Sequence, residues 1–123
     1  MAKIDVMRLM GLLALLSGCT LDFEHISTNE TRAEQAWMNL AYPVFARDCA
    51  TCHTNTVGFL AGSTPLEVRE SLLTWQPPVV DVSNPTASRI LTKGLHDGPA
   101  LTAQETSDIL SWLQAEREAE TGN

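Results

Sequence analysis

The pattern of hydrophobic and polar positions predicts a helix that begins near Thr28. Apolar side chains then recur at the spacing of one helical face, at Ala33, Ala36, Trp37, Leu40, Ala41, Val44 and Phe45. Ser27, Thr28 and Asn29 are all residue types that cap helix N-termini. Pro43 falls within this run, and because proline disrupts a helix interior, it predicts a kink or a second helical segment.

Two further helices are marked by capping boxes, Thr64 to Glu67 and Thr102 to Glu105. The first predicts a short helix ending at Leu72 or Leu73. The second opens a terminal helix whose apolar stripe is Ile109, Leu110, Trp112 and Leu113. Asn84-Pro85 opens another short helix, and residues 79–82 are extended but too isolated to imply a sheet. The prediction is an all-α chain of about four short helices with long loops, which call for something large to pack against.

The N-terminus resembles an export signal. Lys3 and Arg8 precede an apolar run over residues 9–16, which small residues end. This run is too short to span a bilayer, which needs roughly 20 apolar residues. A secretory signal is therefore expected.

Leu16-Ser17-Gly18-Cys19 also resembles the lipobox of bacterial lipoproteins. In that family the cysteine is lipidated and becomes the first residue of the mature chain. The resemblance implies that residues 1–18 are removed. Residues 21–28 are polar and mixed, without periodicity, so residues 19–28 are expected to form a lipidated tether and residues 29–123 the domain. Thr20 favours the outer membrane, since inner-membrane lipoproteins often carry Asp there, and leaves the side of that membrane open. The alternative is an ordinary signal peptide with an unrelated cysteine.

The charge balance restricts the partners. The 123-residue chain has a net charge of −7, which argues against nucleic acid and against direct adhesion to anionic lipid. It is compatible with docking to a basic surface on a partner protein. A merely soluble exported domain explains the charge equally well.

The strongest chemical signal is Cys49-Ala50-Thr51-Cys52-His53. If Cys19 carries lipid, the other two of the three cysteines both lie here, so no disulfide framework stabilises the fold. A zinc site is one reading, but zinc needs four ligands and this stretch gives at most three. His25 or His96 would have to supply the fourth.

A thiol–disulfide oxidoreductase is a second reading, because a CxxC pair at a helix start has a lowered thiol pKa. That reading expects a preceding strand and a βαβ frame, whereas here a helix precedes the pair. A plain structural disulfide is also open.

Covalent haem attachment is the favoured reading, since C-x-x-C-H is the c-type haem signature. The thiols of Cys49 and Cys52 add to the vinyl groups on one edge of the porphyrin, and His53 then lies under the iron. Attachment takes place outside the cytoplasm, which agrees with an export signal.

With these features the chain resembles the small single-haem cytochromes c, most of all the short cytochrome-c-like domains common in planctomycetes. The resemblance covers roughly residues 33–113 and includes residues 84–91 and 101–113 besides the haem signature. It implies a cytochrome-c-like fold around one covalently bound haem c. In that fold the first and last helices cross, which would pair Trp37 or Leu40 with Trp112 or Leu113.

The family usually supplies a methionine as the second axial ligand, from the loop before the last helix. Here no methionine follows the haem signature, and Met38 lies on the preceding helix. His96 stands where methionine is expected, so ligation by His53 and His96 is predicted. The alternatives are a surface histidine with an open iron, and His25, which is a poorer candidate because it lies in the tether.

The expected function is electron transfer between redox partner proteins, without catalysis. No paired carboxylates, nucleophile–base pair or phosphate loop indicates a substrate site. The alternatives are a haem-bearing sensor or assembly subunit, in which the haem is structural or binds a gas, and a lipoprotein thiol oxidoreductase. Donors for the haem propionates are available and unassigned: Arg47, Arg69, Trp75, Arg89 and Lys93.

Overall fold

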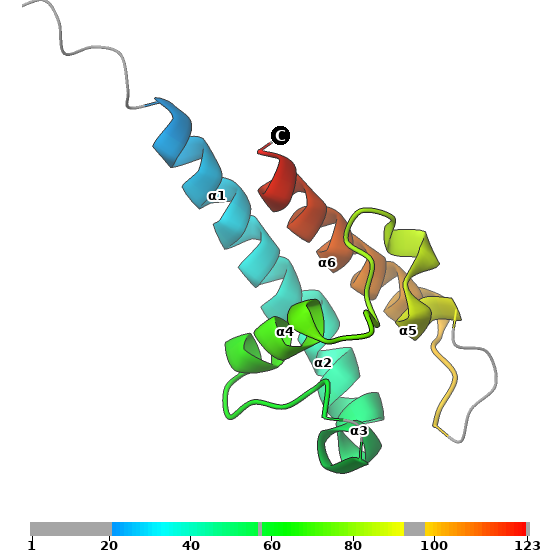
Figure 1. The fold of residues 1–123 in the computed structure, drawn as a ribbon. Helices are drawn as coiled ribbons and strands as arrows, with labels where there is room; N and C mark the ends of the chain where they lie inside the picture. Colours follow the sequence, from blue (N-terminus) through cyan, green and yellow to red (C-terminus); the bar gives the residue numbers. More distant parts are fainter. Residues whose placement is uncertain (1–20, 57, 93–97, 123) are drawn as a thin grey trace, which may run out of the picture.

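The computed structural model describes residues 21–56, 58–92 and 98–122. This part of the chain is mostly helical and contains no strand, so the predicted all-α class is confirmed for it (Figure 1). Within the same ranges, no helix has both the length and the apolar character needed to cross a bilayer.

One continuous helical path leads to the cysteine pair. Its segments are α1 (Leu21–Ala36), η1 (Trp37–Ala41), α2 (Tyr42–Val44), η2 (Phe45–Cys49) and α3 (Ala50–Thr56). The helix begins at Leu21, so the predicted start near Thr28 is wrong. Asn29 is buried within the helix and does not cap it. Cap-type residues mark a start only if the preceding backbone leaves the helical region, and here it does not.

Pro43 changes the type of helix without breaking it. The segments on either side of α2, η1 and η2, are π-helical, and the N–H of Tyr42 donates to the carbonyl of Trp37. Because proline has no N–H and crowds the preceding turn, a wider turn before it relieves that conflict. The predicted second segment at Pro43 is therefore observed as a change of helical pitch.

The first and last helices run antiparallel to each other. From one end to the other, Arg32 Nη1 lies 2.9 Å from Glu118 Oε2, the rings of Trp37 and Trp112 are 4.8 Å apart, and Arg47 pairs with Glu105. The last helix is α6 (Ala103–Thr121), which lies beside α1 in Figure 1. The predicted contact between Trp37 and Trp112 is confirmed.

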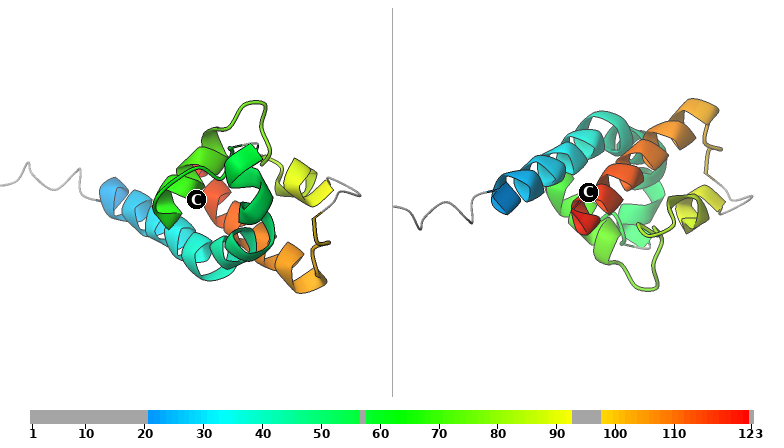
Figure 2. Two further views of the ribbon diagram at one scale, coloured as in Figure 1. Left: turned by 90° about the horizontal axis from the view of Figure 1, so that it is seen from below. Right: turned by 90° about the horizontal axis from the view of Figure 1, so that it is seen from above.

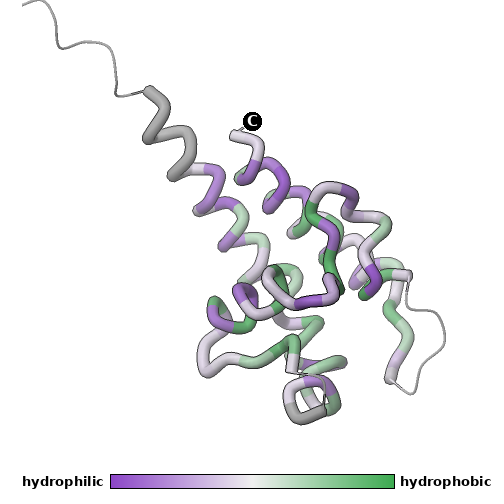
Figure 3. The backbone as a smooth tube through the Cα atoms, in the orientation of Figure 1, coloured by the Kyte–Doolittle hydropathy of each residue, from purple (hydrophilic) through white to green (hydrophobic). Residues whose placement is uncertain are grey.

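Aromatic rings form the centre of the core. Trp37, Phe45 and Trp112 are almost completely buried, and their ring centroids lie 4.8 to 6.1 Å apart. Ring pairs at such distances add to the free energy gained by burying their area. In Figure 3 hydrophobic segments gather in the lower part of the molecule, whereas the C-terminal part of α6 is largely hydrophilic. The core therefore lies at the end of the molecule where the haem signature also lies.

Helix α4 (Pro65–Thr74) is held by polar contacts to both long helices. The predicted capping box is present, with the Thr64 side chain accepting from the N–H of Glu67. Trp37 Nε1 donates to the carbonyl of Pro65 at 2.7 Å. Arg69 forms a bidentate pair with Glu116 of α6, at 2.6 and 2.7 Å. The hydrogen bond from Glu116, together with its negative charge, raises the pKa of Arg69 above its usual value.

A short helical corner precedes the last helix. It consists of η3 (Pro85–Ala87) and α5 (Arg89–Thr92). Both views in Figure 2 show α5 beside the first half of α6 and far from the N-terminal end of α1. Residues 79–82, predicted to be extended, form no strand, but the carbonyl of Val79 accepts from the N–H of Ile90 at 3.1 Å.

Candidate functional site: a pocket beside Cys49 and His53

The helical path from η2 into α3 places the residues of the haem signature on one face. Cys52 and His53 lie three and four residues after Cys49, and both separations bring a side chain next to that of Cys49 on a helix. Cys49 and His53 are half-buried and Cys52 is exposed. Cys52 is therefore the most accessible to solvent of the three side chains.

The ring of His53 packs against Phe59. The two ring centroids are 4.5 Å apart, and the Nδ1 atom of His53 is buried. The carbonyl of His53 accepts a hydrogen bond from the N–H of Gly58 at 2.6 Å, and Gly58 has a φ of 82°. Because L side chains rarely adopt that φ, glycine is required where the chain turns back to bring Phe59 over the imidazole.

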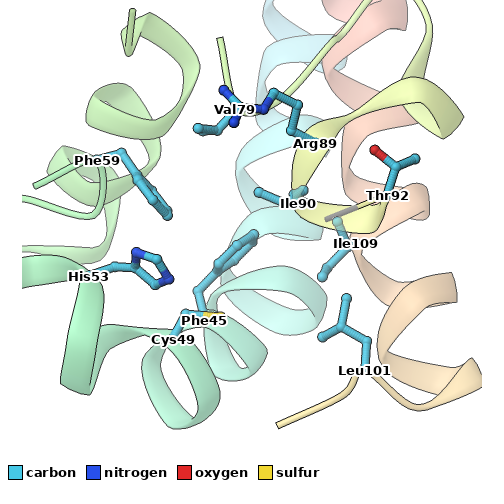
Figure 4. Close-up of a pocket in the computed structure, with 10 residues that line it drawn as sticks. All are labelled: Phe45, Cys49, His53, Phe59, Val79, Arg89, Ile90, Thr92, Leu101 and Ile109. Atoms are coloured by element: carbon cyan, nitrogen blue, oxygen red, sulfur yellow. The ribbon is translucent and has the colours of Figure 1, made fainter. Parts of the chain in front are cut away.

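A cavity of about 370 Å³ opens beside these residues. In Figure 4 the side chains of His53, Phe45 and Phe59 border one side of it, and those of Ile90, Ile109 and Leu101 border the other. The described residues that line it come from separate parts of the chain: Phe45, Cys49, His53, Phe59, Val79, Arg89, Ile90, Thr92, Leu101 and Ile109. Its volume lies within the range of about 300 to 1,000 Å³ that small-molecule and cofactor pockets occupy.

The pocket is predominantly apolar and continuous with the core. Phe45 belongs both to the aromatic cluster and to the pocket wall, and Ile109 is buried at the start of α6. Arg89 is the one cation among the described lining residues, and Figure 4 draws it on the side opposite Cys49. Such a pocket suits a large apolar group that also carries negative charge.

The donor set fits a c-type haem. Cys49 and His53 both line the cavity, so a thiol and an imidazole face the same apolar space. Cys52 lies one helical turn after Cys49 at the surface, and the described thiols of Cys49 and Cys52 do not form a disulfide. Residues 21–56, 58–92 and 98–122 contain no cluster of three or more His, Cys, Asp or Glu side chains able to hold a metal ion.

The predicted second axial ligand, His96, lies outside the described residues, as does the predicted lipidation site Cys19. Thr92 precedes His96 in the sequence and Leu101 follows it, and both of these described residues line the pocket. Met38 is 42% exposed and is not among the described residues that line the pocket.

Several pocket residues carried no recognisable signal in the sequence. Phe59 follows the haem signature in a loop, where a single apolar residue has no periodicity. Val79 and Leu101 lie in non-helical segments. Phe45 and Ile109 did have a signal in the sequence, because each lies on the apolar face of a predicted helix.

Comparison of the chain with protein-family models finds no match, and neither do comparisons with curated proteins and with solved structures.

Proposed function

We propose that this chain is a single-haem c-type cytochrome that carries electrons between redox partner proteins at the cell envelope. The observation that carries the proposal is that Cys49 and His53 face one apolar cavity of about 370 Å³. The proposal includes the cytochrome-c-like fold, and the all-α architecture and the contact of Trp37 with Trp112 between the first and last helices support it.

Each residue of the signature has a separate role in this proposal. Cys49 and Cys52 would hold the porphyrin through thioether bonds, in which each S–H adds across a vinyl double bond and no oxidant is needed. His53 would bind the iron, with Phe59 fixing the plane of its ring. When bound, the haem supplies one-electron redox chemistry.

The apolar walls determine how that chemistry behaves. Phe45, Ile90 and Ile109 present apolar surface to the cavity, and burial of a haem against such surface is one of the factors that set its potential. His96 is proposed as the second axial ligand. Two imidazoles would keep the potential below that of methionine-ligated relatives and would disfavour chemistry with oxygen at the iron.

The decisive test is a pyridine haemochrome spectrum after extraction with acidified acetone. The full chain is produced in a cell that exports proteins and attaches haem covalently. We expect the haem to stay with the protein and to show the band position of haem bound by two thioethers. The variant in which Cys49 and Cys52 are both serine is the matched control, and it should lose its haem on extraction.

Loss of all haem from the unaltered chain would contradict the proposal. Titration of the thiols of Cys49 and Cys52 would then decide whether they act as a redox pair instead.

A further inference from the structure

Five arginines lie in the described residues, and one of them, Arg117, binds Gln114 on its own helix and does not line the pocket. The other four are Arg32, Arg47, Arg69 and Arg89, which differ in whether an anion in the pocket could meet them. Arg69 is already paired with carboxylates, because its guanidinium binds Glu116 through two hydrogen bonds and Glu30 through a third at 2.9 Å. Its side chain is only 11% exposed and does not line the pocket.

Arg47 is also paired. Its guanidinium donates to both carboxylate oxygens of Asp48, at 2.8 and 2.7 Å, and also binds Glu105. These interactions, the Asp48 hydrogen bonds first, raise the pKa of Arg47 above its usual value. Arg32 binds Glu118 and lies on α1, outside the pocket lining.

Arg89 differs from the other three. It lines the pocket, and no described carboxylate forms an ion pair with it. The guanidinium group is therefore available to a ligand, and a positive charge at the edge of an otherwise apolar cavity attracts an anion strongly.

The backbone around Arg89 is held in place from both sides. Ser88, which precedes it, is buried, and its hydroxyl accepts from the N–H of Asp81 at 2.8 Å. Ile90, which follows it, donates its N–H to the carbonyl of Val79 at 3.1 Å. These contacts fix the backbone at Arg89, so the point from which its exposed side chain leaves the corner beside the pocket is a property of the fold.

The position of Arg89 corresponds to the chemistry of the porphyrin edge. Haem carries its vinyl groups on one edge and its propionate carboxylates on the opposite edge. Cys49 and Arg89 lie on opposite sides of the pocket (Figure 4). A porphyrin attached at Cys49 therefore directs its carboxylates toward the side that Arg89 occupies.

We infer that Arg89 binds a propionate carboxylate of the haem and so fixes the orientation of the ring in the pocket. The inference rests on the proposed function and adds to it the residue that recognises the anionic edge. A guanidinium group suits this role because its planar fork binds both oxygens of a carboxylate.

The test compares R89Q with R89K and with R32Q, all as haem-loaded full-length protein. Haem labelled with ¹³C at its carboxylates allows the propionate bands to be identified in the infrared spectrum. In R89Q we expect these bands to shift, and the reduction potential to become more negative, because a cation near the haem favours its reduced form. R32Q should match the unaltered protein, since Arg32 pairs with Glu118 away from the pocket.

R89K tests the positive charge of Arg89 separately from the planar geometry of its guanidinium group. It should restore most of the potential because it keeps the positive charge, but it should not restore the bands of a carboxylate bound at both oxygens. R89Q or R89K with covalently attached haem, unshifted propionate bands and an unchanged potential would overturn the inference. Failure of the unaltered chain to retain haem would overturn the proposed function, and the inference with it, and this result is seen before any variant is compared.

Discussion

At the scale of single residues, the iron ligands decide the electronic state of the proposed haem. His53 faces the pocket with its ring packed on Phe59. Replacing His96 with alanine would remove the proposed second imidazole, so we expect the low-spin spectrum to become high-spin, as measured by electronic absorption. His25→Ala is the control and should stay low-spin. A low-spin spectrum in His96→Ala would refute ligation by that residue.

The ion pair between Arg69 and Glu116 is the most buried of the ion pairs among the described residues. The two side chains are only 11% and 5% exposed, and Trp112 Nε1 also donates to Glu116. Glu116→Gln leaves the Arg69 guanidinium with only the more exposed carboxylate of Glu30 as counter-charge, so we expect the free energy of unfolding to fall by up to about 3 kcal/mol. Urea unfolding of the haem-loaded protein measures this change.

Glu118→Gln provides the matched control for that variant. Glu118 also pairs with an arginine across α1 and α6, but Arg32 is 63% exposed in this pair. An exposed ion pair contributes at most about 1 kcal/mol, so this variant should be nearly as stable as the unaltered chain. Equal losses in the two variants would mean that burial of the Arg69–Glu116 pair does not matter.

At the scale of helices, the sequence predicted the features that depend on residues close together along the chain. Both capping boxes are present, at Thr64 and at Thr102, because each uses only residues within one turn. The inner helix face was also correct, since Trp37 and Phe45 are buried as their spacing predicted. The pairing of Arg69 with Glu116 had no local signal, because it joins residues that only tertiary packing brings together.

The contribution of the capping box of α6 to stability can be tested by mutation. Thr102 accepts a hydrogen bond from the N–H of Glu105 at 3.2 Å and donates its own N–H to the Glu105 carboxylate at 2.7 Å. Thr102→Ala removes the first of these bonds, so we expect the free energy of unfolding to fall by about 1 kcal/mol in urea unfolding. Thr121→Ala, at the opposite end of α6, should have little effect, and an equally large loss there would show that the cap is not the cause.

At the scale of the whole molecule, the net charge of −7 should govern encounters with redox partners. We expect the rate of electron exchange with a small cationic reagent to fall as salt is added, because salt screens the attraction. The rate with an anionic reagent should rise under the same conditions. Stopped-flow kinetics at several ionic strengths measures both, and salt dependences of the same sign would contradict electrostatic steering.

The lipid anchor is also a property of the whole chain. If Cys19 is lipidated, Cys19→Ser should move the protein from the membrane fraction to the soluble fraction of the cell envelope without changing its haem content. Fractionation followed by haem staining measures both quantities. An unchanged distribution would show that another feature holds the protein at the membrane.

The order in which the pocket walls occur along the chain has a consequence for biosynthesis. Cys49 and Cys52 come early, whereas Leu101 and Ile109 belong to the last part of the chain. A chain exported with its N-terminus first therefore presents both thiols before the cavity can close around them. The two thiols would thus be open to haem attachment only until α6 packs against the rest of the fold. The time that α6 takes to pack would set how long the thiols stay accessible.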